Sequence, residues 1–470
     1  MQRILLFKES CQLSEECLDK SFDNSNDFEK EKIINKLLLS RVLKRVVLNV
    51  DIDDLNTSEE GNHDSVVKYK FSFVGILTID SYCLVVYPKY IQNIDNDFYN
   101  NQLKLRQIIN VIDKSRLMNE SILGQEEYSA NILPLMIKIL KDYQSQGLYH
   151  TDQAIIEYNG EGSINWDLTV NECQTYLVNK KPYYFDFYTD NQRLDEFNII
   201  RKLHACIITD IAKQLEPILS LFDINYVELT NDTIFDFGDI DHINYLLNSE
   251  LSLQFITKKR LILCDLLNYI NSSQYSDEEL GIDLYGTNSF NLVWEQVCRV
   301  IYQDDLYKKL NSLKLRLSDA ENNIDYRSLL TLKDIVDKPV WNYQGEKFTA
   351  SKTLELDVLR VNHHDKKFEI YDGKYYTVKV NKNSISGQPG VSDITKQYLY
   401  QLAFSKLAQI NQFSFSNAFV IPVDELNRDY GDGVDYGFVK LAMFNELNLN
   451  DIQIIARDAQ TAFDMFLKMT

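Results

Sequence analysis

Apolar and polar residues alternate in some stretches of the chain and recur at helical spacing in others. Between residues 69 and 91, two β-rich runs flank Asp80-Ser81, and this pattern predicts a β-hairpin. Four longer stretches have the spacing of amphipathic helices. They are residues 33–48, 102–144, 196–215 and 255–271. The first half of the chain is therefore predicted to be a mixed α and β region.

Glycine and polar residues gather near Gly281–Asn288, and a different order of elements follows. The patterns predict a helix, two strands, a second helix and a third strand. The expected ranges are Phe290–Leu310, Thr353–Val361, Lys367–Val380, Ser392–Ile410 and Phe413–Pro422. This order predicts a multidomain α/β protein: a mixed N-terminal and middle region in residues 1–280, then a mixed sheet flanked by helices in residues 281–470.

The predicted strand Lys367–Val380 carries two charged residues on an otherwise apolar face. Asp372 and Lys374 share that face with apolar and aromatic residues, because strand side chains alternate between two faces. A carboxylate in such a row is costly unless it is paired or binds a metal. One interpretation is a structural ion pair at a strand end. The other is a catalytic pair with an ion and a water molecule between the two groups.

The preceding predicted strand contributes a second acid. Only the short polar turn 362–366 separates the two strands, so they are expected to be antiparallel neighbours. Asp357 can then lie beside Asp372, and two carboxylates this close repel unless a divalent cation lies between them. Glu355 is on the same face as Asp357 and is a rival for the same role.

Polar residues on the two predicted helices complete the set. Glu295 lies in the apolar stripe of the first helix, as a functional acid or as a surface residue at the edge of the stripe. On the second helix, Gln397 and Gln401 share a face, and Ser392 is the expected N-cap. These glutamines are either solvated or in contact with a DNA phosphate or a metal-bound water.

Composition narrows the class of protein. The formal net charge of −20 disfavours a general nucleic-acid binder, although residues 366–382 form a local lysine-rich patch. The seven cysteines are scattered without a C-x-x-C pair, which indicates reduced thiols in the cytoplasm. No run of residues has the length and apolar content of a membrane span or a signal peptide. We therefore expect a cytoplasmic protein without a membrane partner.

The acids and the lysine together suit phosphodiester hydrolysis. Carboxylate oxygens bind Mg²⁺, or Mn²⁺ in its place, and such an ion polarises a phosphate and lowers the pKa of an attacking water. A lysine beside the ion stabilises charge in the transition state. On this hypothesis Asp357, Asp372 and Glu295 hold the metal, while Lys374 and Gln397 or Gln401 assist catalysis.

The same ordered set resembles the PD-(D/E)xK nuclease superfamily, whose core is a mixed sheet with flanking helices. Glu295, Asp357, Asp372 and Lys374 match its pattern. Leu356 stands where a proline precedes the first Asp, and Gly373 stands where a small apolar residue is usual. The Q-x-x-x-Y motif also departs, since Gln401 is followed by Ser405 and Gln397 by Tyr400, one place early.

A narrower resemblance is to the McrC-type subunits of McrBC restriction systems, and above all to the LlaJI family. It is carried by segments spread over most of the chain. They are Phe73–Ile76 with Leu84–Lys89, Gly162–Trp166, Phe290–Arg299, Tyr371–Tyr376 and Ser392–Phe404.

That resemblance implies a DNA endonuclease subunit that depends on a McrB-like AAA+ GTPase. Its N-terminal half would dock to the GTPase ring and stimulate GTP hydrolysis. The sequence has no G-x-x-x-x-G-K-[ST], so GTP is expected only through the partner. The alternative is an adaptor that activates the GTPase and has a degenerate nuclease fold. A small-molecule enzyme is a third class, but no cofactor fingerprint supports it.

Overall fold

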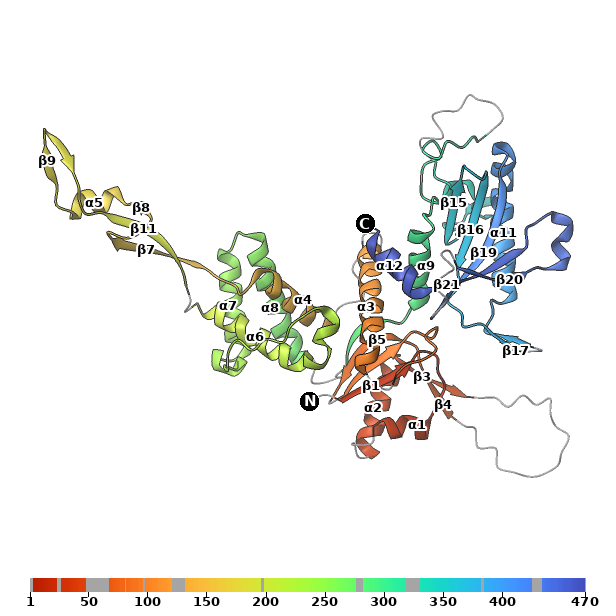
Figure 1. The fold of residues 1–470 in the computed structure, drawn as a ribbon, viewed down its shortest axis with the longest axis horizontal. Helices are drawn as coiled ribbons and strands as arrows, with labels where there is room; N and C mark the ends of the chain where they lie inside the picture. Colours follow the sequence, from red (N-terminus) through yellow and green to blue (C-terminus); the bar gives the residue numbers. More distant parts are fainter. Residues whose placement is uncertain are drawn as a thin grey trace. The chain divides into compact units, whose positions relative to one another are not determined.

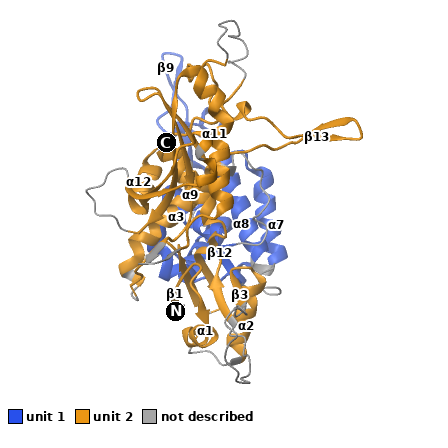
Figure 2. Ribbon diagram, turned by 90° about the vertical axis from the view of Figure 1, so that its right-hand side faces the viewer, with its two compact units in different colours: residues 1, 129–284 blue, residues 2–128, 285–470 orange. Residues whose placement is uncertain are grey.

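The computed structural model divides the chain into two compact units (Figure 2). It describes residues 3–22, 27–47, 67–80, 82–95, 98–120, 132–195, 198–275, 282–317, 330–381, 384–424 and 433–469. Unit 1 comprises residues 1 and 129–284, and unit 2 comprises residues 2–128 and 285–470. The expected boundary near residue 281 falls at the end of unit 1, whereas residues 2–128 pack with residues 285–470. The assignment of docking to residues 1–280 and of cleavage to residues 281–470 stays a prediction.

The N-terminal part of unit 2 is built on a four-stranded sheet. Its strand order is β1 (Arg3–Lys8), β6 (Tyr82–Tyr87), β5 (Val74–Ile79) and β12 (Ile282–Thr287). The predicted hairpin is confirmed, since β5 and β6 are antiparallel and Ile79 pairs with Tyr82. Asp80 in the turn has a φ of 49°, a conformation that two-residue hairpins require. All residues of β5 and β6 are buried.

A smaller sheet and three helices accompany this sheet. The predicted helix 33–48 is wrong in its second half: α2 spans Asp27–Leu39, and β3 follows at Leu43–Val47. Arg41, with a φ of 60°, reverses the chain between them, and the β-branched residues after it favour a strand. The remaining elements are β2 (Leu13–Ser14), α1 (Glu15–Ser21), β4 (Val67–Phe71) and α3 (Phe98–Glu120). Residues 51–64, which are polar and acidic in sequence and are expected to form a loop, lie outside the described residues.

Gly75 in β5 permits a close approach of β12. Its φ is +140°, and a Cβ atom there would lie 2.2 Å from the carbonyl oxygen of Tyr285. Only glycine fits such a contact. The Val-Gly step of the hairpin segment therefore has a packing role, because it brings the start of the C-terminal part against the N-terminal sheet.

The C-terminal part of unit 2 is a mixed five-stranded sheet with helices on it (Figure 1). The strand order is β15 (Val358–Asn362), β16 (Lys367–Gly373), β19 (Ser414–Val423), β21 (Ile452–Asp458) and β20 (Val434–Val439). The central strands β16, β19 and β21 are parallel, and both edge strands are antiparallel to their neighbours. Helix α9 (Phe290–Ile301) packs on β16, α11 (Val391–Asn411) on β16 and β19, and α12 (Ala459–Lys468) on β21.

The predicted order of these elements is confirmed, but several bounds are wrong. The first helix ends at Ile301 instead of Leu310, β15 begins at Val358 instead of Thr353, and β16 ends at Gly373 instead of Val380. Short elements fill the connections. They are η4 (Lys333–Ile335), β13 (Val340–Tyr343), β14 (Glu346–Thr349), β17 (Lys379–Asn381), β18 (Ser384–Ser386) and η5 (Ala442–Leu447).

Unit 1 consists of a helical core and a long β arm (Figure 1). The core contains α4 (Leu133–Gln146), α6 (Ile199–Leu215), η2 (Glu216–Phe222), η3 (Ile234–Phe237), α7 (Ile240–Leu253) and α8 (Thr257–Tyr275). The arm contains β7 (Asp152–Tyr158), β8 (Ser163–Ile164), α5 (Trp166–Glu172), β9 (Tyr176–Val178), β10 (Lys181–Tyr183) and β11 (Tyr188–Leu194). The helices predicted at 196–215 and 255–271 are confirmed as α6 and α8. Among the described helices, none has the length and apolar content needed to cross a membrane.

Candidate active site

Asp357 and Asp372 meet where the antiparallel strands β15 and β16 come together. Val358 pairs with Tyr371, so the register places the preceding Asp357 opposite Asp372. The backbone N–H of Gly373 donates to Oδ2 of Asp357 at 2.9 Å. The predicted proximity of the two acids is confirmed. Asp357, however, lies just before its strand and not within it, because β15 begins one residue later.

One of the two carboxyl groups is buried and the other is half-buried. Asp372 is only 5 % exposed, and a side-chain hydrogen bond links it to Asp357. Burial raises the pKa of Asp357 well above its usual range, and the hydrogen bond and the charges of Asp372 and Glu295 raise it further. Two like charges this close repel each other, and a shared proton or a cation would relieve that repulsion.

Lys374 lies between two carboxylates. Its Nζ atom is 3.0 Å from Oδ2 of Asp372 and 3.1 Å from Oδ1 of Asp393. Burial alone would lower the pKa of Lys374, but the two acids raise it above its ordinary value. The lysine is therefore positively charged beside Asp372. It was expected within the strand, but it directly follows the end of β16.

Asp393 was missed as a site residue by the sequence analysis. The expected N-cap at Ser392 is wrong, because α11 begins at Val391 with Gly390 as its cap. Asp393 accepts the Gly390 N–H at 3.3 Å and the Tyr376 hydroxyl at 3.1 Å. Although burial opposes the effect, the hydrogen bond from Lys374 holds the pKa of Asp393 below its usual range. An acid in the first turn of the helix was the only available signal, and that signal is typical of capping.

Glu295 reaches the same site from α9. It lies at the edge of the buried stripe of the helix and is half-buried. Burial raises the pKa of Glu295, and the charge of Asp372 raises it further. The charge of Asp372 therefore acts on Glu295, and the structure brings the predicted acids together with Lys374.

Gly373 allows α9 to pack directly on β16. A Cβ atom there would lie 3.2 Å from the Cα of Glu295 and 3.3 Å from the Sγ of Cys298. Both contacts are tighter than ordinary van der Waals packing. The departure from the superfamily pattern at Gly373 therefore has a packing reason, since a Cβ atom there would require α9 or the Cys298 side chain to shift. Leu356, the other departure, is buried in the core beneath α11.

The two predicted glutamines are in the interior, where amide partners hold them. Gln397 is fully buried and donates to Oδ1 of Asn417 at 2.6 Å. Gln401 is 4 % exposed and exchanges hydrogen bonds with Asn450. The expectation that they are solvated is wrong for both. Neither amide has a hydrogen bond to the acids or Lys374 among the described residues, and these contacts are those of structural residues.

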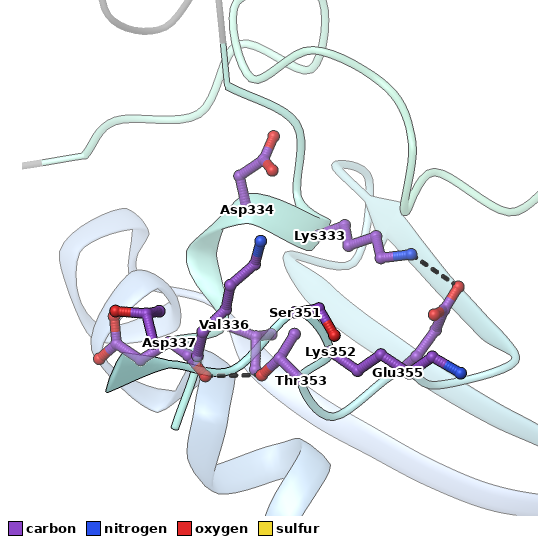
Figure 3. Close-up of a pocket in the computed structure, with 10 residues that line it drawn as sticks. Lys333, Asp334, Val336, Asp337, Ser351, Lys352, Thr353 and Glu355 are labelled. Atoms are coloured by element: carbon purple, nitrogen blue, oxygen red, sulfur yellow. Dashed lines mark hydrogen bonds and ion pairs between the residues drawn. The ribbon is translucent and has the colours of Figure 1, made fainter. Parts of the chain in front are cut away.

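Glu355, the rival of Asp357, belongs to a separate cavity. Its carboxylate forms an ion pair with Lys333 at 2.9 Å and accepts a hydrogen bond from Tyr307. Figure 3 shows Lys333 and Glu355 pointing toward each other on the wall of this cavity, which measures about 720 Å³. Asp357, not Glu355, is thus the acid next to Asp372.

Comparisons with known proteins point to one class. A model of the LlaJI restriction endonuclease family matches residues 73–328 and 326–452. YdjA of Bacillus subtilis (strain 168), a component of the type II restriction enzyme BsuMI, is 24% identical over 468 residues, which cover 96% of this chain and 90% of YdjA.

Two solved structures show weaker likeness. A half-complex from a tetradecameric assembly of Thermococcus gammatolerans McrB AAA+ hexamers with bound McrC matches at 13% identity and a TM-score of 0.40, with 99% of each chain covered. The cryo-EM structure of the Thermococcus gammatolerans McrBC complex matches at 13% identity and a TM-score of 0.21, with 57% and 79% covered. Scores this low carry no argument about fold or function.

Proposed function

Because the chain belongs to the LlaJI restriction endonuclease family, we propose that it is the DNA-cleaving subunit of a two-component restriction system. The reaction is metal-dependent hydrolysis of phosphodiester bonds in double-stranded DNA. The mixed sheet of unit 2 would then be a PD-(D/E)xK nuclease core, and Glu295, Asp357, Asp372 and Lys374 its active site. The resemblance of this sequence to McrC-type subunits suggests that the second component is a McrB-like AAA+ GTPase.

The observation that carries this proposal is the hydrogen-bonded pair Asp357–Asp372, with Nζ of Lys374 3.0 Å from Oδ2 of Asp372. Two carboxyl groups this close fit a divalent cation, because the cation would remove the repulsion between them. Asp357, Asp372 and Glu295 offer the hard oxygen ligands that Mg²⁺ or Mn²⁺ prefers. When bound, such an ion supplies Lewis acidity to the phosphate and lowers the pKa of the attacking water.

The other groups of the site stabilise charge in the transition state and hold the acids in position. Lys374 brings a positive charge to the place where negative charge develops on the phosphate, and its ion pair with Asp393 keeps it oriented. The N–H of Gly373 holds the Asp357 carboxyl in position. The partial burial of the acids shields them from bulk water, which strengthens each of these interactions.

The partner surface is proposed from unit 1. The arm exposes large apolar side chains on most of its elements. They are Ile156, Tyr158, Ile164, Trp166, Val170, Tyr176, Leu177, Val178, Tyr183 and Phe185. Apolar residues gathered on a projecting element mark an interaction site. We infer that the arm docks to the GTPase, which would supply GTP hydrolysis and most of the affinity of the assembly for DNA.

One observation favours the alternative, a GTPase-activating adaptor without nuclease activity. Among the described residues, no three His, Cys, Asp or Glu side chains are arranged to hold a metal ion as they stand. The two functions differ in the result of one experiment. The chain is combined with a McrB-like GTPase, GTP, Mg²⁺ and plasmid DNA. The nuclease proposal expects strand breaks that disappear in Asp372→Ala while GTPase stimulation persists; GTPase stimulation without any strand breaks establishes the adaptor.

A further inference from the structure

The residue that follows Lys374 is held by the N-terminal sheet. Tyr375 is 6 % exposed, and its hydroxyl accepts the backbone N–H of Lys89 at 3.0 Å and donates to Oε2 of Glu9. Lys89 N–H also approaches Oε2 of Glu9 at 3.3 Å, and its ammonium lies 4.3 Å from the centre of the Tyr375 ring. One tyrosine hydroxyl thus joins two groups that are far from it in the sequence.

The fold places Glu9 and Lys89 at one edge of the N-terminal sheet. Strands β1 and β6 are parallel, and Lys8 pairs with Tyr87. Glu9 directly follows β1, and Lys89 follows β6 after one proline, so both residues leave the carboxyl ends of neighbouring strands. The N–H of Glu9 donates to the carbonyl of Tyr87 at 2.8 Å, which fixes the two chain segments together.

The backbone next to the proposed catalytic lysine is thus fixed on several sides. The Lys374 N–H donates to the carbonyl of Val420 in β19 at 2.9 Å. The Tyr375 ring lies 5.2 Å from the ring of Phe290, the first residue of the helix that carries Glu295. Beyond it, the Thr377 hydroxyl contacts the carbonyl of Lys89 at 3.4 Å. The long side chain of Lys374 gains a fixed base from these contacts.

The polar groups in this contact depend on one another. Glu9 and Lys89 are partly buried, and burial raises the pKa of Glu9 while it lowers that of Lys89. Loss of the Tyr375 hydroxyl would remove the donor of its hydrogen bond to Glu9 and the nearer acceptor of the Lys89 N–H. Glu9 and the Lys89 N–H would then have only their 3.3 Å contact with each other, and weakly satisfied polar groups are costly away from water. Since this cost is relieved by movement of the segment, the position of Lys374 would change with it.

We propose that Glu9, Lys89 and Tyr375 form a clamp through which the N-terminal sheet positions Lys374 for DNA cleavage. The three are positioning residues, because in the described part of the chain none of them has a hydrogen bond or ion pair to the acids of the site. This inference rests on the proposed nuclease function and adds to it: residues 2–128 take part in cleavage itself and are more than a docking region.

The test uses the full chain with a McrB-like GTPase, GTP, Mg²⁺ and plasmid DNA. Tyr375→Phe removes the hydroxyl and keeps the ring, and Glu9→Ala removes the acceptor. We expect each to lower kcat for cleavage by roughly 10- to 100-fold, with less than a twofold change in KM for DNA, in GTPase stimulation and in Mg²⁺ affinity measured by calorimetry. The double variant should lose no more than either single variant, because both break the same contact.

Two controls separate positioning from general damage. Glu9→Gln keeps an oxygen that accepts both hydrogen bonds, so it should stay within about twofold of wild type. Tyr149→Phe also removes a buried hydroxyl bound to a glutamate, Glu250 at 2.6 Å, but in unit 1, and it should leave cleavage unchanged.

The outcomes separate the two proposals. A wild-type assembly that makes no strand breaks overturns the nuclease function and this inference with it. If wild type cuts DNA and the Tyr375→Phe variant cuts equally fast, the clamp alone is overturned. Equal losses in cleavage, DNA affinity and GTPase stimulation also overturn it, because they indicate damage to the fold.

Discussion

The acid site of unit 2 and the arm of unit 1 break the usual rules of burial in opposite ways. Where β15 begins and β16 ends, Asp372 is buried, and its carboxyl group is hydrogen-bonded to that of the half-buried Asp357. On the arm, the large apolar side chains of Leu177 and Phe185 are 74% and 72% exposed. Buried charge and exposed apolar surface both cost stability.

Other buried acids of unit 2 show what is special about the first region. Asp305 accepts the Val361 N–H at 2.8 Å and pairs with Lys308 at 2.7 Å. Asp424 accepts the Gln92 N–H at 3.0 Å and pairs with Lys104 at 2.9 Å. Each of these acids has its own cation, as a structural acid should. Asp357 instead has the carboxyl group of Asp372 as its side-chain partner. This difference supports the proposed cation site, as the exposed apolar side chains of the arm support the proposed docking surface.

The largest effect is expected from Lys374→Ala. Loss of its charge removes several kcal/mol of transition-state stabilisation, so cleavage by the reconstituted assembly should fall by roughly a hundredfold or more. Mg²⁺ affinity measured by calorimetry should not weaken, because the acids remain. Lys308→Ala, which removes a lysine paired with the structural Asp305, is the matched control and should cut normally. Equal loss in both variants would refute a special role for Lys374.

A smaller effect is expected from Leu177→Ser combined with Phe185→Ser on the arm. Loss of two exposed apolar anchors should weaken binding to the GTPase by about tenfold or more. GTPase stimulation, titrated against the concentration of this chain, reports the change. Phe255→Ser removes a residue of unit 1 outside the arm that is 89% exposed, and it should have no effect. The arm is not the docking element if the control weakens binding as much.

Stability should show the repulsion between the acids directly. The pKa of Asp357 is raised in the folded state, so its contribution to stability is present at low pH and is lost as the pH rises through the folded-state pKa. In EDTA at pH 7.5, Asp357→Asn should therefore unfold with a free energy higher by on the order of 1 kcal/mol. Added Mg²⁺ should raise the Tm of wild type and not that of the variant. If thermal melts show that the Asn variant is less stable than wild type, the expected repulsion between the two acids is refuted.

The smallest effect, on the pH dependence of stability, is expected from His204, which belongs to neither the acid site nor the arm. This buried residue accepts the Tyr149 N–H at Nδ1, and burial, with the charge of Arg201, lowers its pKa to about 4. The unfolded chain binds a proton near pH 6.5, so stability should fall as the pH drops from there toward about 4. Between pH 7.5 and 5.5, urea unfolding of wild type should lose roughly 1 kcal/mol more than that of His204→Gln. The exposed His364→Gln control should behave as wild type.

Local pattern predicted much of the fold and the principal acids. The hairpin at Asp80, the helices α6 and α8, and the order of elements around the C-terminal sheet followed from alternation and helical spacing alone. The pairing of Asp357 with Asp372 followed from a short turn between two strands, since a short connection leaves little choice of topology.

Bounds and partners were harder to predict. The sequence continues to alternate beyond Gly373, yet the strand ends there, because Tyr375 is bound instead to Glu9 and Lys89 of the N-terminal sheet. Gln401 has the spacing of a surface residue, but a loop residue, Asn450, covers it. Contacts between distant segments have no local signal in one sequence.

The sequence by itself determined which residue types are present and at what spacing: two acids, a lysine two positions after the second, and a glutamate on an earlier helix. Only the tertiary structure decided that Asp357 and not Glu355 faces Asp372, that Asp393 joins Lys374, and that the first strands of the chain hold the segment after the lysine. The physical reason is that hydrogen bonds and burial act through space, so a group's pKa and position depend on neighbours that the order of residues does not identify.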